Sequence, residues 1–182
     1  MASLVGVSAR GEKTRVWDIG VRLFHWSLVA AVAGAYLFES PRKLHEAFGY
    51  AVIGLVGFRV LWGLIGTPHA RFSDFVPGPR RLFSYLRDMV RGQENRHLGH
   101  NPAGGAMVIA LLLLLTAISS TGYLMGTDAY FGEEWLEDLH EALVDGLLVL
   151  IALHLAGVVL ASLRHRENLV AAMITGWKDS HD

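Results

Sequence analysis

Four long apolar blocks, separated by shorter polar segments, dominate the hydrophobic pattern of this chain. They cover residues 23–38, 47–65, 103–125 and 142–163. A helix needs about 20 mostly apolar residues to cross a bilayer, within a range of about 17 to 25. The last three blocks reach that length directly, and residues 17–21 extend the first, with Arg22 reaching toward the headgroups. The pattern predicts four transmembrane helices.

A soluble four-helix bundle is the alternative for the same pattern. Each of its helices would carry a polar face toward water, and residues 107–115 (Met-Val-Ile-Ala-Leu-Leu-Leu-Leu-Leu) have none. Of the 182 residues, 52% are hydrophobic and only 18% are charged, which is too apolar for a soluble domain of this size. We therefore predict an all-α membrane protein. The polar first fifteen residues do not resemble a cleaved signal peptide.

Basic residues lie mainly in the segments that would share one side of the membrane. These are Arg10, Lys13, Arg15, Arg22, Arg71, Arg80, Arg81, Arg87, Arg91, Arg96, Arg164, Arg166 and Lys178. The other side has Arg42 and Lys43, and its second loop, around residues 128–138, carries only acids. Basic loops stay in the cytoplasm, so we predict that both termini are cytoplasmic.

Two segments on the predicted cytoplasmic side have helical amphipathic spacing. Residues 80–91 place Leu82, Leu86, Met89 and Val90 opposite arginines, and residues 166–178 repeat Leu169, Val170, Met173, Ile174 and Trp177. We expect both to lie on the membrane surface as interfacial helices. For the second segment, docking on a partner subunit is an equally good interpretation.

Four of the nine histidines fall in or at the ends of the predicted spans. His25 and His154 belong to the cytoplasmic half, whereas His45 and His140 belong to the far half. His154 follows His140 by 14 residues, a rise of about 21 Å that leaves the two side chains within about 40° of each other. The spacing therefore predicts two histidine pairs, one above the other. The remaining histidines, including His97 and His100, are expected to be solvated.

Histidines inside a membrane are costly and usually functional, although one alone can simply bond a neighbouring helix. Two imidazoles that face each other across a bundle suit a planar macrocycle with both axial positions filled. The chain has no cysteine, which excludes thiolate ligation and covalent haem attachment. Gly49 and Gly157, each about one turn after a histidine, would let a porphyrin approach the backbone. Close helix packing is the alternative for both glycines.

Several motifs resemble those of bacterial cytochrome b561 and the b-type cytochrome subunits of nickel–iron hydrogenases. They are Arg22-Leu-Phe-His25-Trp26, His45-Glu-Ala-Phe-Gly49-Tyr50, Arg59-Val-Leu-Trp62-Gly63, His100-Asn-Pro-Ala-Gly104, His140-Glu-Ala, Leu153-His154 and the tail from Arg164 to Gly176. The resemblance implies two non-covalent haems b, ligated by His25 with His154 and by His45 with His140. It also implies a bacterial inner membrane and exchange of electrons with quinone. The expected fold is a four-helix bundle enclosing two haems, with residues 16–178 as one domain and residues 1–15 as a cytoplasmic tail.

Two further residues are candidates for cofactor contacts. Arg59 lies 14 residues after His45 on the same helix face, where a haem propionate would be its anion; snorkelling is the alternative. Asn101 precedes Pro102 and is expected to cap the third span, where the helix end could face a propionate or a quinone oxygen. Asp145 is either a proton relay or an interfacial acid.

Two axial ligands per iron leave no open position, which indicates electron transfer rather than oxygen chemistry. The leading prediction is a cytochrome that exchanges electrons with quinone and a redox partner, acting alone as a quinol oxidase. The alternative is a membrane-anchor subunit of a hydrogenase or periplasmic dehydrogenase. A divalent-metal transporter is a third hypothesis. The expected partners are lipid, quinone and a periplasmic electron carrier or dehydrogenase subunit, with no nucleic acid.

Overall fold

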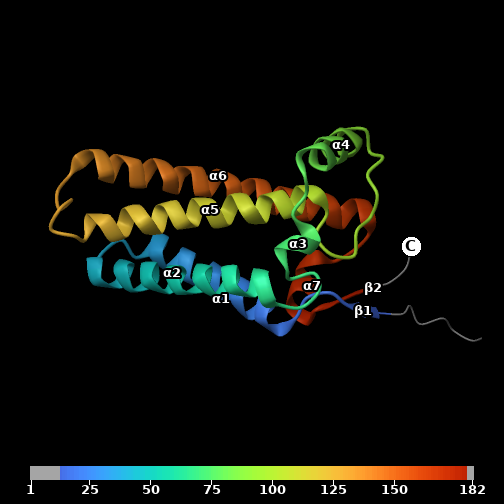
Figure 1. The fold of residues 1–182 in the computed structure, drawn as a ribbon, viewed down its shortest axis with the longest axis horizontal. Helices are drawn as coiled ribbons and strands as arrows, with labels where there is room; N and C mark the ends of the chain where they lie inside the picture. The colour runs from blue at the N-terminus through green and yellow to red at the C-terminus, as the bar shows by residue number, and fades with distance from the viewer. Residues whose placement is uncertain (1–12, 180–182) are drawn as a thin grey trace, which may run out of the picture.

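The computed structural model describes residues 13–179, so Arg10, His181 and most of the predicted N-terminal tail lie outside the described residues. Four long helices dominate the fold: α1 (Ile19–Leu37), α2 (Arg42–Ile65), α5 (Pro102–Met125) and α6 (Glu134–His165) (Figure 1). Each is long and apolar enough to cross a membrane. The predicted all-α membrane architecture is confirmed, and the chain is an integral membrane protein.

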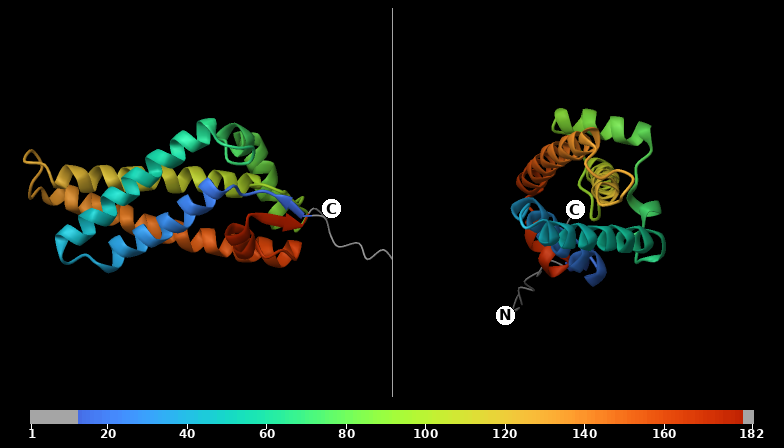
Figure 2. Two further views of the ribbon diagram at one scale, coloured as in Figure 1. Left: turned by 90° about the horizontal axis from the view of Figure 1, so that it is seen from below. Right: turned by 90° about the vertical axis from the view of Figure 1, so that its left-hand side faces the viewer.

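The long helices form two hairpins. Helix α1 packs against α2, α5 packs against α6, and the hairpins meet mainly through α2 and α5, as the end-on view in Figure 2 shows. Phe24, Val56, Leu112 and Leu147 are among the buried side chains of the core they share. Large apolar side chains such as Leu113 remain exposed on the outside of the bundle, where they would contact lipid.

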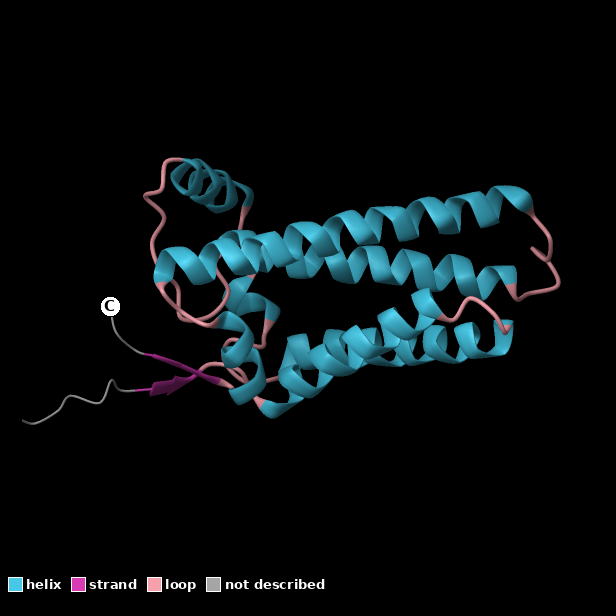
Figure 3. Ribbon diagram, turned by 180° about the vertical axis from the view of Figure 1, so that it is seen from behind, coloured by secondary structure: helices cyan, strands magenta, loops and turns pink. Residues whose placement is uncertain are grey.

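Short elements cover one end of the bundle, which we call the capped end. They are α3 (Phe72–Phe75), α4 (Pro79–Val90), α7 (Leu169–Thr175), β1 (Lys13–Arg15) and β2 (Trp177–Asp179) (Figure 3). The other end, the open end, carries only the connections at residues 38–41 and 126–133. The predicted amphipathic helix at residues 80–91 is confirmed as α4, with Tyr85 buried and Phe83 and Val90 exposed.

Two glycines allow close packing of side chains against the long helices. A Cβ atom on Gly34 would lie 2.6 Å from the ring of Phe48, and one on Gly63 would lie 2.2 Å from the ring of Phe72. Real side chains do not approach so closely, so both positions need glycine. These contacts join α1 to α2 and α2 to α3.

The chain departs from the predicted pattern near both termini. The helix expected over residues 166–178 ends at Thr175, because Gly176 adopts a left-handed φ of 89°. The chain then continues as β2, which pairs antiparallel with β1. The first span begins at Ile19, since Asp18 caps it by accepting a 2.9 Å hydrogen bond from the Val21 amide.

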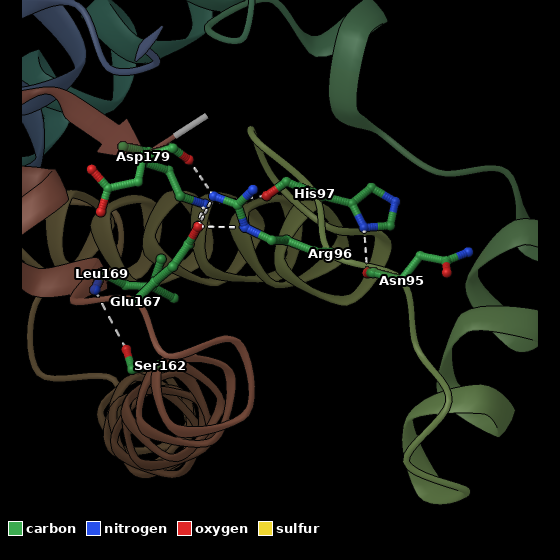
Figure 4. Close-up of polar contacts among 8 residues, drawn as sticks. Asn95, Arg96, His97, Ser162, Glu167, Leu169 and Asp179 are labelled. Atoms are coloured by element: carbon green, nitrogen blue, oxygen red, sulfur yellow. Dashed lines mark hydrogen bonds and ion pairs between the residues drawn. The ribbon is translucent and has the colours of Figure 1, made fainter. Parts of the chain in front are cut away.

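A charged cluster connects the paired strands β1 and β2 to the rest of the capped end. The Glu167 carboxylate accepts a 2.6 Å hydrogen bond from Arg96 Nε and lies 2.9 Å from Lys178 Nζ. Arg96 also donates to the Asp179 carbonyl (Figure 4). Lys178 donates to the His97 carbonyl. Burial alone would raise the pKa of Glu167, but its bonds from Lys178 and Arg96 outweigh burial and lower it.

We expect Glu167→Gln to destabilise the capped end by about 3 kcal/mol, because Lys178 would remain buried without its carboxylate. A lowered pKa in the folded state stabilises the fold above the ordinary value of 4.5, and this contribution is lost as the pH falls through the lowered pKa. Hydrogen exchange at the backbone amides of residues 177–179 should therefore be faster in Glu167→Gln than in the wild type.

The control is Glu46→Gln, which breaks the exposed Arg42–Glu46 pair. This change should lower the free energy of unfolding by less than about 1 kcal/mol. Equal protection of residues 177–179 in both variants would contradict a stabilising role for Glu167.

Candidate functional site

The first predicted histidine pair lies toward the capped end. The ring centres of His25 on α1 and His154 on α6 are 6.5 Å apart, with an interplanar angle of 48°. The Nδ1 atom of His25 is buried and has no hydrogen-bond partner among residues 13–179. The pair joins α1 of one hairpin to α6 of the other.

The second pair lies toward the open end. The ring centres of His45 on α2 and His140 on α6 are 6.4 Å apart, with an interplanar angle of 69°. His45 Nδ1 lies 2.9 Å from the Ala35 carbonyl oxygen, and His140 Nδ1 lies 2.8 Å from the Thr121 hydroxyl. The carbonyl can only accept, so His45 carries its proton on Nδ1. Its Nε2 atom then has no proton and can bind a metal through its lone pair.

Both pairs have the separation that one metal ion between two imidazoles requires. Metal–imidazole bonds are about 2 Å long, and the ring centre lies about 1 Å beyond the nitrogen, so the two ring centres are expected about 6 Å apart. Within the described part of the chain, no group of three or more His, Asp or Glu could share a metal ion. The histidines are arranged as two pairs, which is the ligand number of a haem with both axial positions filled.

Arg59 is almost completely buried, with 2% of its surface exposed. Its guanidinium lies over the rings of Phe72 and Phe75, with its carbon 4.9 and 5.6 Å from the ring centres. Its Nη1 atom has no hydrogen-bond partner in the described chain. The side chain does not extend to the surface as a snorkelling arginine would, and a buried guanidinium needs an anion.

His100 was expected to be solvated, and that expectation is wrong. Its ring packs between Trp17 and Phe75, with ring centres 4.6 and 4.4 Å away, and its Nδ1 atom is buried without a partner in the part of the chain described. Burial, followed by the nearby charge of Arg59, lowers the pKa of His100 to about 3. The only signal in the sequence was its place directly before the Asn101-Pro102 cap.

One known protein family matches nearly the whole chain. Residues 16–176 match the family described as prokaryotic cytochrome b561. The chain belongs to this family.

Three curated relatives carry the name probable Ni/Fe-hydrogenase B-type cytochrome subunit. The Bradyrhizobium diazoefficiens protein is 22% identical, over 100% of this chain and 92% of its own length. The Azotobacter vinelandii protein is 25% identical, over 90% and 87%. The Cupriavidus necator protein is 25% identical, over 97% and 93%. No solved structure matches the chain.

The remaining candidate residues of this cytochrome b561 family member are Asn101, Gly49, Gly157 and Asp145. Asn101 is the predicted cap of α5, and its side chain accepts a 2.7 Å hydrogen bond from the Gly104 amide. Cβ atoms on Gly49 and Gly157 would meet no atom within 4 Å, so neither glycine serves close helix packing here. Asp145 is exposed on α6.

Proposed function

We propose that this chain binds two haems b and serves as the membrane-anchor cytochrome subunit of a nickel–iron hydrogenase-type complex. The observation that carries the proposal is the pair of histidine sites, with ring centres 6.5 and 6.4 Å apart, near opposite ends of the bundle. Each haem would supply an iron that accepts and releases one electron without binding substrate.

The chain's own residues would hold the two cofactors. His25 and His154 would ligate the capped-end haem, and His45 and His140 the open-end haem. Open space beside Gly49 and Gly157 would admit the macrocycle edges. Arg59 would donate to a propionate of the capped-end haem, since its buried Nη1 atom lacks another partner in the described residues.

The relatives support the subunit function better than the stand-alone quinol oxidase, because they are named as cytochrome subunits of a hydrogenase. We therefore favour the alternative over our leading prediction from the sequence. A quinone and lipid would be the membrane partners. His140 and His154 are separated by a rise of about 21 Å along α6. The haems that they would help to hold would supply electron transfer between a protein partner at one membrane surface and quinone near the other.

The basic capped end and the acidic loop at the open end favour a single orientation. Arginines and lysines stay on the cytoplasmic side, which would place both termini in the cytoplasm of a bacterium and the open end in the periplasm. The periplasmic partner subunit would then dock on the open end.

The purified protein is expected to contain two low-spin haems b per chain. His140→Ala should disturb mainly the open-end haem and His154→Ala mainly the capped-end haem, as absorption spectra and the haem-to-protein ratio would show. His165→Ala, a histidine at the capped end outside both pairs, is the control. One haem per chain, or a high-spin resting spectrum, would contradict the proposal.

Redox titration of the same protein tests Arg59. Arg59→Leu should lower the midpoint potential of the capped-end haem, because a nearby positive charge favours the more negative reduced form. Arg59→Lys retains the charge and should shift the potential less. An unchanged potential at full haem content would show that Arg59 does not contact the cofactor.

A hydrogenase partner should co-purify with the tagged chain in a fixed ratio, and hydrogen should reduce the haems of that complex. Removing the partner should abolish reduction by hydrogen and leave the spectrum of chemically reduced haem unchanged. If a quinol analogue reduces the haems while no stoichiometric partner is present in the native membrane, the stand-alone oxidase is the better description.

The orientation can be tested by labelling, since the chain contains no cysteine. Asp128→Cys at the open end and Gln93→Cys at the capped end each introduce one exposed thiol. In spheroplasts, a membrane-impermeant thiol reagent should label position 128 directly and position 93 only after permeabilisation. The opposite pattern would reverse the topology.

A further inference from the structure

We propose that Thr121 is a positioning residue that fixes the tautomer and the donor strength of His140, and thereby lowers the midpoint potential of the open-end haem. The inference rests on the proposed function, because it concerns the haem that His140 would ligate. Thr121 is not a ligand itself and would act only through the histidine.

The hydrogen bonds around Thr121 favour one arrangement of protons. Its hydroxyl oxygen lies 2.9 Å from the Ile118 carbonyl and 2.8 Å from His140 Nδ1. The Ala117 carbonyl lies 3.2 Å from the same oxygen, and a helical threonine commonly donates to such backbone carbonyls of its own helix. With the hydroxyl proton donated there, the oxygen accepts from the histidine. His140 therefore carries its proton on Nδ1, and Nε2 keeps the lone pair that an iron needs.

Local packing holds the histidine ring in this position. Thr121 is 7% exposed, so water does not readily replace its hydroxyl. A Cβ atom on the next residue, Gly122, would lie 3.2 Å from His140 Cε1, so the glycine makes room for the ring against α5. A side chain at position 122 would require the His140 ring to shift.

The two histidine sites differ in this respect. Both open-end histidines have a Nδ1 partner, the Ala35 carbonyl for His45 and the Thr121 hydroxyl for His140. At the capped end, His25 Nδ1 has no partner within residues 13–179. An acceptor on Nδ1 makes the imidazole a stronger donor to its metal, and a stronger donor stabilises the oxidised iron relative to the reduced iron.

The test is a redox titration of holoprotein that carries Thr121→Val. The variant keeps the shape of threonine and removes the acceptor, so the open-end haem should become easier to reduce by about tenfold, or about 59 mV for one electron. Its low-spin EPR signal should also change, because the ring of His140 is no longer held. The capped-end haem should keep its potential.

Two further variants separate this role from general stability. Thr116→Val removes a hydroxyl whose single hydrogen bond within residues 13–179 goes to the Leu112 carbonyl on the same helix, and it should leave both potentials unchanged. Thr121→Ser retains an acceptor and should restore most of the wild-type potential.

Two outcomes would overturn the inference: an unchanged open-end potential in Thr121→Val with both haems bound, or an equal shift in Thr116→Val. Wild-type protein that binds no haem would instead refute the proposed function, so the two failures can be told apart.

Discussion

An imidazole buried in an apolar bundle has two ring nitrogens, and both need partners. This constraint connects the helix geometry to the site. At His45, the partner of Nδ1 is the carbonyl of Ala35 in the last turn of α1, where a helix leaves its carbonyls without intrahelical bonds. At His140, it is the hydroxyl of Thr121 on α5. In both cases the second nitrogen remains available to a cofactor between the hairpins.

At the capped end, several buried polar atoms lack such partners within the described chain. The buried atoms His25 Nδ1, Arg59 Nη1 and His100 Nδ1 have no partner in the chain as described. A fold that leaves several buried polar atoms unpaired at one end loses stability unless something else bonds them. In the proposed complex a haem propionate would pair with Arg59 and remove part of that cost, which would stabilise this end of the bundle.

The features that follow helical periodicity could be predicted from the sequence. The four spans, α4 and both histidine pairs rest on hydrophobic runs and on the 14-residue spacing of His140 and His154, and the structure has each of them. The contacts between distant segments could not be predicted. Three-residue strands carry no usable periodicity, and Arg96 meets Glu167 across 71 residues of sequence. Thr121 gave no signal because serine and threonine commonly bond their own helix backbone. The burial of His100 could not be predicted, because it depends on where Trp17 and Phe75 lie in the folded chain.

The pairing of β1 with β2 has a consequence for how the molecule assembles. Lys13 pairs with Asp179, so strand β1 can pair only after nearly the whole described chain has been synthesised. Closing so long a loop costs entropy that local helix formation does not. On a ribosome the spans are made one after another, and this ribbon can form only when the last of them has left the tunnel. The β1–β2 pairing is therefore a late step in folding, after all four spans have been made.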